Sequence, residues 1–145
     1  MAPHPSSSNE QQAAGIALVN ALSDHLGIAL ESKVLQLGDD CTIQIDGYSD
    51  EPPVVCEAWA HIGKLRGSQP DKVMADAFKL LFCEKLLRKR FRKILLFADD
   101  NAKRYFSGVN WQAKCLREHN IEVIALRLPA ALLNKIAKAQ ERQYR

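Results

Sequence analysis

The chain has 145 residues, of which 47% are hydrophobic and 26% charged. This size and composition are typical of one globular domain that buries roughly two-thirds of its extended-chain surface, and they exclude a chain that is disordered throughout. No apolar run approaches the ~20 residues of a membrane-spanning helix, and the first dozen residues lack the apolar core of a secretory signal, so we expect a cytoplasmic protein without a membrane partner. The net charge of +3 is compatible with a nucleic-acid partner but does not require one.

The four cysteines stand at positions 41, 56, 83 and 115, too far apart for a CxxC motif. Two of them lie within the apolar stretches VVCEAWA and KLLFCEKLL, so we expect buried, reduced thiols rather than disulfides. The four histidines are scattered and none pairs with a cysteine at zinc-finger spacing, which argues against a structural zinc site.

The first half of the chain predicts one helix and three strands. Residues 1–10 are polar and rich in Pro and Ser and are expected to be a disordered tail, which leaves 11–145 as a single α/β domain. Residues 11–31 carry apolar side chains at spacings of three and four, which predicts a helix with one buried stripe. Strands are then predicted over 33–37, 41–46 and 54–61, with a hairpin turn at 38–40 and a polar loop at 47–53.

The second half alternates helices and strands. Ser68 is a plausible N-cap and Pro70 suits the first turn of a helix that continues to about residue 90. The elements predicted after it are strand 93–98, helix 101–119 with Phe106, Trp111 and Leu116 as core anchors, strand 121–128 and helix 130–145. The expected order is α-β-β-β-α-β-α-β-α, an antiparallel meander followed by parallel crossovers, which predicts a mixed five-stranded sheet flanked by helices.

Two acidic residues stand at informative places in this order. Asp46 ends the second strand in TIQIDGY, and Glu57 lies inside the third strand in VVCEAWA. From about residue 11 to 128 the pattern resembles the PD-(D/E)xK nuclease superfamily, which has the restriction-endonuclease-like fold. The resemblance implies that Asp46 and Glu57 bind Mg²⁺ or Mn²⁺, and that Glu31, near the end of the first predicted helix, matches a further acid of many members. The lysine expected two residues after the second acid is replaced by Trp59.

Elementary chemistry gives reasons for such a pair. Mg²⁺ prefers hard oxygen ligands, and two carboxylates on adjacent strands repel each other unless a cation joins them. A bound metal can polarise a phosphodiester oxygen and lower the pKa of its water. Glu57 stands between apolar residues and would be costly to bury without a partner. The alternative is that Asp46 is only a turn residue before Gly47 and that Glu57 pairs with a lysine of the following helix.

A polar stripe on that helix offers a substitute for the missing lysine. Gln69, Lys72, Asp76 and Lys79 are spaced so that they share one helical face. If this face meets the third strand, Lys72 can act near the scissile phosphate, and Gln69 resembles the functional glutamine of exonuclease branches of the superfamily. Lys64, in the turn GKLRG, is a second candidate for this cation; the turn lacks the spacing of a nucleotide-binding P-loop. A merely solvated helix face is the alternative for the stripe.

Other charges allow two interpretations. The segment 85–93 holds six cations in nine residues, and these can contact phosphates or simply offset the dipole of a helix C-terminus. Asp99 and Asp100 follow the fourth strand and can add to a polar cleft or start the next helix.

The leading hypothesis is a Mg²⁺-dependent nuclease acting on DNA or RNA. The alternatives are a non-catalytic nucleic-acid- or protein-binding module, which Trp59 favours, and a small subunit that buries one face in a homodimer.

Overall fold

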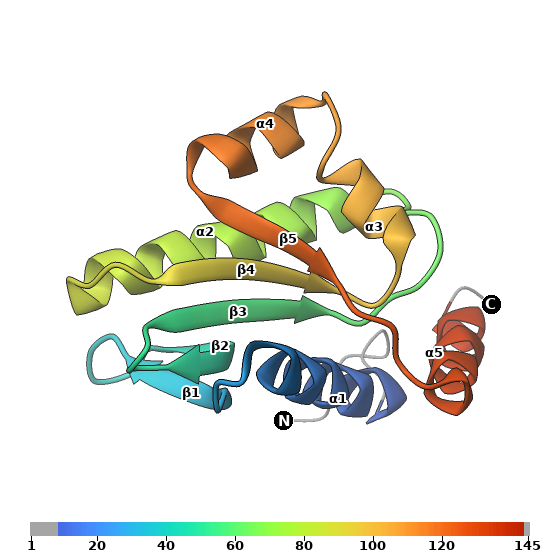
Figure 1. Cartoon of the computed structure of the whole chain (residues 1–145), viewed down its shortest axis with the longest axis horizontal. Coiled ribbons are helices and arrows are strands. Elements are labelled where there is room, and N and C mark those ends of the chain that lie inside the picture. Colours follow the sequence, from blue (N-terminus) through green and yellow to red (C-terminus); the bar gives the residue numbers. More distant parts are fainter. Residues whose placement is uncertain (1–8, 144–145) are drawn as a thin grey trace.

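The computed structural model describes residues 9–143, so nearly all of the predicted N-terminal tail lies outside the described residues. Five strands form one sheet and helices cover both of its faces (Figure 1). The helices are α1 (Asn9–Leu26), α2 (Gln69–Leu87), α3 (Asp100–Tyr105), α4 (Trp111–Glu118) and α5 (Ala130–Gln143). The strands are β1 (Glu31–Gln36), β2 (Thr42–Ser49), β3 (Val54–Trp59), β4 (Arg92–Phe97) and β5 (Ile121–Ala125). The prediction of an α/β chain with a mixed five-stranded sheet is confirmed.

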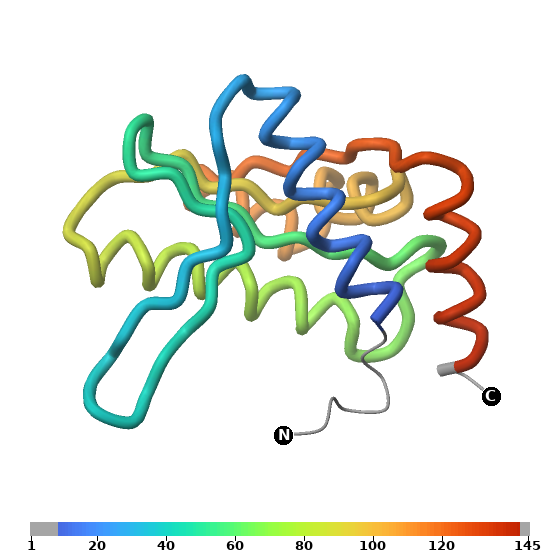
Figure 2. The backbone as a smooth tube through the Cα atoms, turned by 90° about the horizontal axis from the view of Figure 1, so that it is seen from below, coloured from blue at the N-terminus to red at the C-terminus, as the bar shows by residue number. Residues whose placement is uncertain are grey.

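The strands are ordered β1-β2-β3-β4-β5 across the sheet. The first three are antiparallel, and β3, β4 and β5 run parallel because helices carry the chain back between them. The β1–β2 hairpin closes at the predicted turn, where the Leu37 N–H donates to the Cys41 carbonyl at 2.7 Å. Figure 2 shows this hairpin extending away from the helices.

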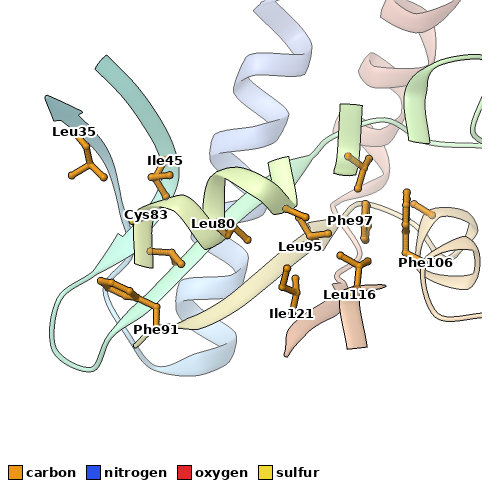
Figure 3. Close-up of a cluster of buried hydrophobic side chains, with 14 residues drawn as sticks. Leu35, Ile45, Leu80, Cys83, Phe91, Leu95, Phe97, Phe106, Leu116 and Ile121 are labelled. Carbon is orange, nitrogen blue, oxygen red and sulfur yellow. The ribbon is translucent and has the colours of Figure 1, made fainter. Parts of the chain in front are cut away.

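Two apolar clusters lie on opposite faces of the sheet. One packs α2, α3 and α4 against one face and includes Leu80, Leu95, Phe97 and Leu116 (Figure 3). The other packs α1 and α5 against the opposite face. The interior strand β4 contributes alternate residues to both clusters, which explains the continuous apolar run ILLFA that begins in this strand.

The predicted helix over 101–119 is wrong, because two short helices occupy this segment. Asp99 caps α3 by accepting the Asn101 N–H at 3.1 Å, and Asn110 caps α4 by accepting the Ala113 N–H at 2.8 Å. Trp111 was predicted to anchor the core, but its place at the first residue of α4 leaves it 63% exposed. The capping residue before it redirects the chain, so the helical spacing does not continue across 106–110.

Several predicted boundaries also need correction. The first helix ends at Leu26, where Gly27 takes a positive φ of 67° that favours glycine, and Glu31 therefore starts β1 instead of ending the helix. The second strand continues past Asp46 to Ser49, into the segment that was predicted as a loop. β3 and β5 end earlier than predicted, at Trp59 and Ala125.

The cysteine prediction agrees with the structure. Cys56 and Cys83 are buried, Cys41 is exposed, Cys115 is partly buried, and all four are free thiols. Among residues 9–143, none of the helices combines the length and the apolar character that crossing a bilayer demands.

Candidate metal centre

A β-bulge in β2 shapes the candidate site. Lys33 pairs with Ile45, and Glu31 pairs with Tyr48, so two steps along β1 match three steps along β2. One extra residue is therefore accommodated in β2 next to Gly47. At Gly47 a Cβ would lie 2.5 Å from Cys56 Sγ and 3.1 Å from a Val19 methyl carbon, so these side chains fill the space that a larger residue would need.

Beyond the bulge, acidic side chains replace the backbone ladder between β2 and β3. Regular pairing extends from Ser49 to Gly47. At the next position, the Asp46 N–H donates to Glu57 Oε2 at 3.1 Å, and the Ala58 N–H donates to Asp46 Oδ2 at 2.9 Å. Asp46 and Glu57 thus lie on neighbouring strands, and each carboxylate is held by a backbone N–H of the other strand. The alternative in which Asp46 is a turn residue is wrong, because Asp46 lies inside a strand.

Glu57 points toward α2 and forms an ion pair with Lys79. The Glu57 side chain is 1% exposed, whereas that of Lys79 is 35% exposed. Oε1 of Glu57 is the oxygen that contacts Lys79, and Oε2 is the one that accepts the Asp46 N–H. The alternative of a helix lysine at Glu57 is therefore correct, and the residue that contacts it is Lys79, the last member of the polar stripe.

The acidic groups share one electrostatic environment. The pKa of Glu57 is raised to about 9, mainly by burial and also by Asp46, while Lys79 opposes the rise. Burial likewise raises the pKa of Asp76 to about 6, with Lys79 opposing and Asp46 adding to the rise. For Lys79, burial favours the neutral form, but the hydrogen bond and charge of Glu57, with the charges of Asp76 and Asp46, leave its pKa raised overall. Carboxyl groups whose pKa values are raised by burial and by a neighbouring carboxylate are typical of a site that takes up a cation or a proton.

An open cleft of about 950 Å³ lies beside Asp46. Its walls come from α1, β1, β2, the end of β3 and the start of α2, and they carry both apolar and polar groups. The lining residues that carry polar, charged or aromatic side chains include Gln11, Gln44, Asp46, Trp59, His61, Arg66, Gln69 and Lys72. The predicted stripe is thus divided: Gln69 and Lys72 border the cleft, while Lys79 contacts Glu57.

Trp59 and His61 form a stacked pair in this cleft, with ring centroids 4.2 Å apart. Burial, together with the charge of Lys72, lowers the pKa of His61 to about 4, so its imidazole is neutral at pH 7. Nδ1 of His61 lies 3.2 Å from the Gln11 amide nitrogen, which fixes this ring against α1. Trp59, which the resemblance places at the lysine position, therefore lines the cleft together with Asp46.

The remaining candidates lie elsewhere. Glu31 is exposed at the start of β1, opposite Tyr48, and its metal role stays a prediction. Lys64 borders a second, smaller cavity of about 500 Å³ between the turn after β3 and α5. Asp99 starts α3 and also accepts the Gly63 N–H at 2.6 Å, so it fastens that turn.

Half of the basic run 85–93 takes part in ion pairs. Lys89 pairs with Asp50, Arg92 with Glu122 and Lys93 with Glu84, at 2.9, 3.0 and 2.8 Å. These three cations are therefore already neutralised within the fold, which weakens the interpretation of the run as a phosphate-binding surface.

The donor set at the bulge is small but fits a hard divalent cation. Within residues 9–143 no group of three or more His, Cys, Asp or Glu side chains is arranged to hold a metal. Mg²⁺ usually takes only one or two protein carboxylates and completes its shell with water and phosphate oxygens. Asp46 and Glu57 can supply these two carboxylates, and Oε1 of Glu57 already contacts one positive charge, the Lys79 ammonium.

The chain has no match among protein-family models, curated proteins or solved structures. Support for a function therefore comes from the convergence of Asp46, Glu57 and Lys79 beside the cleft.

Proposed function

We propose that this chain is a metal-dependent nuclease of the restriction-endonuclease-like type that hydrolyses phosphodiester bonds of DNA or RNA. The observation that supports it most is the meeting of two carboxylates and one ammonium group, Asp46, Glu57 and Lys79, at the point where β2 separates from β3. This is the residue set that the resemblance implies, with the cation supplied by α2 instead of by β3.

Asp46 and Glu57 would hold Mg²⁺ or Mn²⁺. When bound, such an ion supplies charge that polarises the phosphodiester and lowers the pKa of an attacking water. The chain's own contribution is orientation: the Ala58 N–H fixes the Asp46 carboxylate where it borders the cleft, and the Asp46 N–H fixes Glu57. Two carboxylates held in place in this way lose little entropy when they bind the ion.

Lys79 takes the place of the lysine that β3 lacks. Its ammonium group contacts Glu57 from α2, so a cation stands beside the second acid although Trp59 occupies the usual position. About a third of the Lys79 side chain is exposed, so its ammonium group can turn toward an anionic phosphate when a metal neutralises Glu57. Lys72 and Gln69 border the same cleft and are placed to contact the nucleic-acid backbone.

One observation favours the second candidate, a non-catalytic binding module derived from this fold. The Glu57–Lys79 ion pair and the two cross-strand hydrogen bonds of Asp46 already hold the gap between β2 and β3 together without a metal. In this case the cluster is structural, and the cleft with its Trp59–His61 pair binds a nucleic acid that is not cleaved.

A cleavage assay separates the two functions. Labelled single- and double-stranded DNA and RNA are incubated with the protein in Mg²⁺, Mn²⁺ or EDTA, and Glu57→Gln and Asp46→Asn are compared with Glu84→Gln. Glu84→Gln is a matched control, because it changes an α2 carboxylate that pairs with a lysine away from the cleft. We expect metal-dependent cleavage that falls at least ~100-fold in the first two variants only. Binding without cleavage under every condition would support the binding module and overturn the nuclease.

A further inference from the structure

The outer face of α2 carries a row of apolar side chains that the fold leaves uncovered. Phe78 is 73% exposed and Phe82 42% exposed, although each is a large aromatic residue. The residues with which α2 packs on the sheet lie on the opposite side of the helix: Val73, Ala77, Leu80 and Cys83. Figure 2 shows α2 running along the periphery of the molecule.

The spacing of this row is that of a helix-pairing seam. Asp71, Ala75, Phe78, Phe82 and Lys85, here called the outer stripe, follow one another at intervals of four, three, four and three residues. Alternation of three and four keeps side chains on one narrow line of a helix, as in a coiled coil. Single exposed apolar residues are ordinary, but two phenylalanines one turn apart on such a line indicate a contact surface.

The charges at the two ends of the outer stripe indicate which partner packs against it. Asp71 stands at the N-terminal end and Lys85 at the C-terminal end, and Phe78 lies midway between them. A second copy of α2, packed antiparallel about a two-fold axis near Phe78, sets each Asp71 against the Lys85 of the other copy. It also sets the small Ala75 against the large Phe82, which lets the helices approach. A parallel arrangement would place like charges together.

We propose that the outer stripe of α2 is the interface of a homodimer in which the two α2 helices pack antiparallel. The apolar centre supplies burial, and the two Asp71–Lys85 pairs supply orientation. The polar stripe that carries Lys72 and Lys79 lies on another side of α2, so this dimer leaves the cleft of each copy open. This proposal is independent of whether the cleft cleaves its ligand.

Sedimentation equilibrium across the micromolar range tests the interface. We expect the wild-type chain to be a dimer, and Phe78→Glu to raise the dimer dissociation constant at least ~100-fold, because it places two like charges at the centre of the contact. Val109→Glu is the matched control, since Val109 is 88% exposed but lies in the turn between α3 and α4. Circular dichroism confirms that each variant keeps its helices.

A charge exchange tests the antiparallel arrangement itself. Asp71→Lys and Lys85→Glu should each weaken the dimer, and the double variant should recover most of the wild-type affinity because the pairs are restored with opposite sign. A wild-type chain that stays monomeric, or a dimer that Phe78→Glu leaves intact, would overturn the interface. A double variant weaker than both single variants would overturn the antiparallel pairing.

Discussion

Two lysine–carboxylate pairs join α2 to the strands beneath it: Glu84 with Lys93 of β4, and Lys79 with Glu57 of β3. In the first pair, Glu84 Oε2 accepts both the Lys93 ammonium at 2.8 Å and the Phe91 N–H at 2.9 Å. In the second pair, Glu57 Oε1 contacts the Lys79 ammonium and Glu57 Oε2 accepts the Asp46 N–H at 3.1 Å. Each carboxylate thus has one lysine and one backbone donor, and the two pairs differ in that Glu57 also has the Asp46 carboxylate beside it.

The pKa values of the two carboxyls shift in opposite directions. Burial alone would raise the pKa of Glu84, but the hydrogen bonds from Lys93 and from the Phe91 N–H lower it overall. Burial and the neighbouring Asp46 carboxylate together raise the pKa of Glu57 to about 9, although Lys79 opposes the rise. A carboxylate with its own lysine and backbone donor is a structural group. A carboxylate that also faces a second carboxylate needs a further positive charge, which is the property of a metal ligand.

Replacing each of the two lysines by methionine should give the largest effects and should distinguish the two pairs most clearly. Lys93→Met leaves the paired Glu84 without its counter-charge and should lower the free energy of unfolding by ~3 kcal/mol. Lys79→Met should cost less than ~1 kcal/mol, because Glu57 can take up a proton instead, but it should reduce cleavage ~100-fold or more. Urea unfolding and the cleavage assay measure the two effects.

The opposite results for these two variants would refute the distinction between the pairs. Cleavage that survives Lys79→Met, together with a loss of stability as large as that of Lys93→Met, would make Glu57–Lys79 a second structural pair. A loss of cleavage in correctly folded Lys93→Met would show that the Glu84 pair also supports the site.

The pH dependence of stability should separate the two carboxylates in metal-free protein. Because the folded-state pKa of Glu57 is above its ordinary value of 4.5, folding favours its protonated form, and its contribution to stability falls as the pH rises from about 4.5 toward 9. The lowered pKa of Glu84 has the opposite sign: its contribution is present above 4.5 and is lost in acid. Glu57→Gln should therefore gain stability relative to wild type between pH 5 and pH 8, as measured by urea unfolding in EDTA. A constant difference between the two proteins over this range would show that Glu57 has no raised pKa.

A smaller effect, on nucleic-acid binding, is expected from Lys72, which lines the cleft. Lys72→Ala should weaken nucleic-acid binding only modestly and reduce the slope of log affinity against log salt by about one, since one phosphate contact is lost. Fluorescence anisotropy in EDTA, where cleavage is suppressed, gives this slope, and Lys103→Ala on exposed α3 is the control. Equal slopes for the wild type and Lys72→Ala would remove Lys72 from the binding surface.

Much of the sheet could be predicted from local patterns. The apolar run before Asp99 gives β4, the alternation around Ile43 and Ile45 gives most of β2, and Ser68 with Pro70 gives the start of α2. Asp46 and Glu57 could be selected because acids inside strands are unusual. These features depend on spacing within one element, which the sequence displays directly.

The features of the fold and of the site that could not be predicted from the sequence depend on contacts between elements. Asp46-Gly47 has the composition of a turn, and it is the pairing of Gly47 with Cys56 of β3 that continues the strand through both residues. The polar stripe contains more than one lysine, and the position of α2 along β3 determines that Lys79 is the one that contacts Glu57. The break before Trp111 was detectable, because Ser107, Gly108 and Asn110 are turn and capping residues, but the helical spacing of Phe106 and Leu116 hid it.

Thermal unfolding with and without Mn²⁺ tests the claim that Asp46 and Glu57 form a metal site. At a Mn²⁺ concentration ~100 times its dissociation constant, binding to the folded state alone should add ~2.7 kcal/mol and raise the wild-type melting temperature by about 5–10 °C. The same rise is expected in Glu84→Gln and none in Glu57→Gln, because only the latter loses a ligand charge. No rise in the wild type, or an equal rise in Glu57→Gln, would contradict the assignment of Glu57 as a metal ligand.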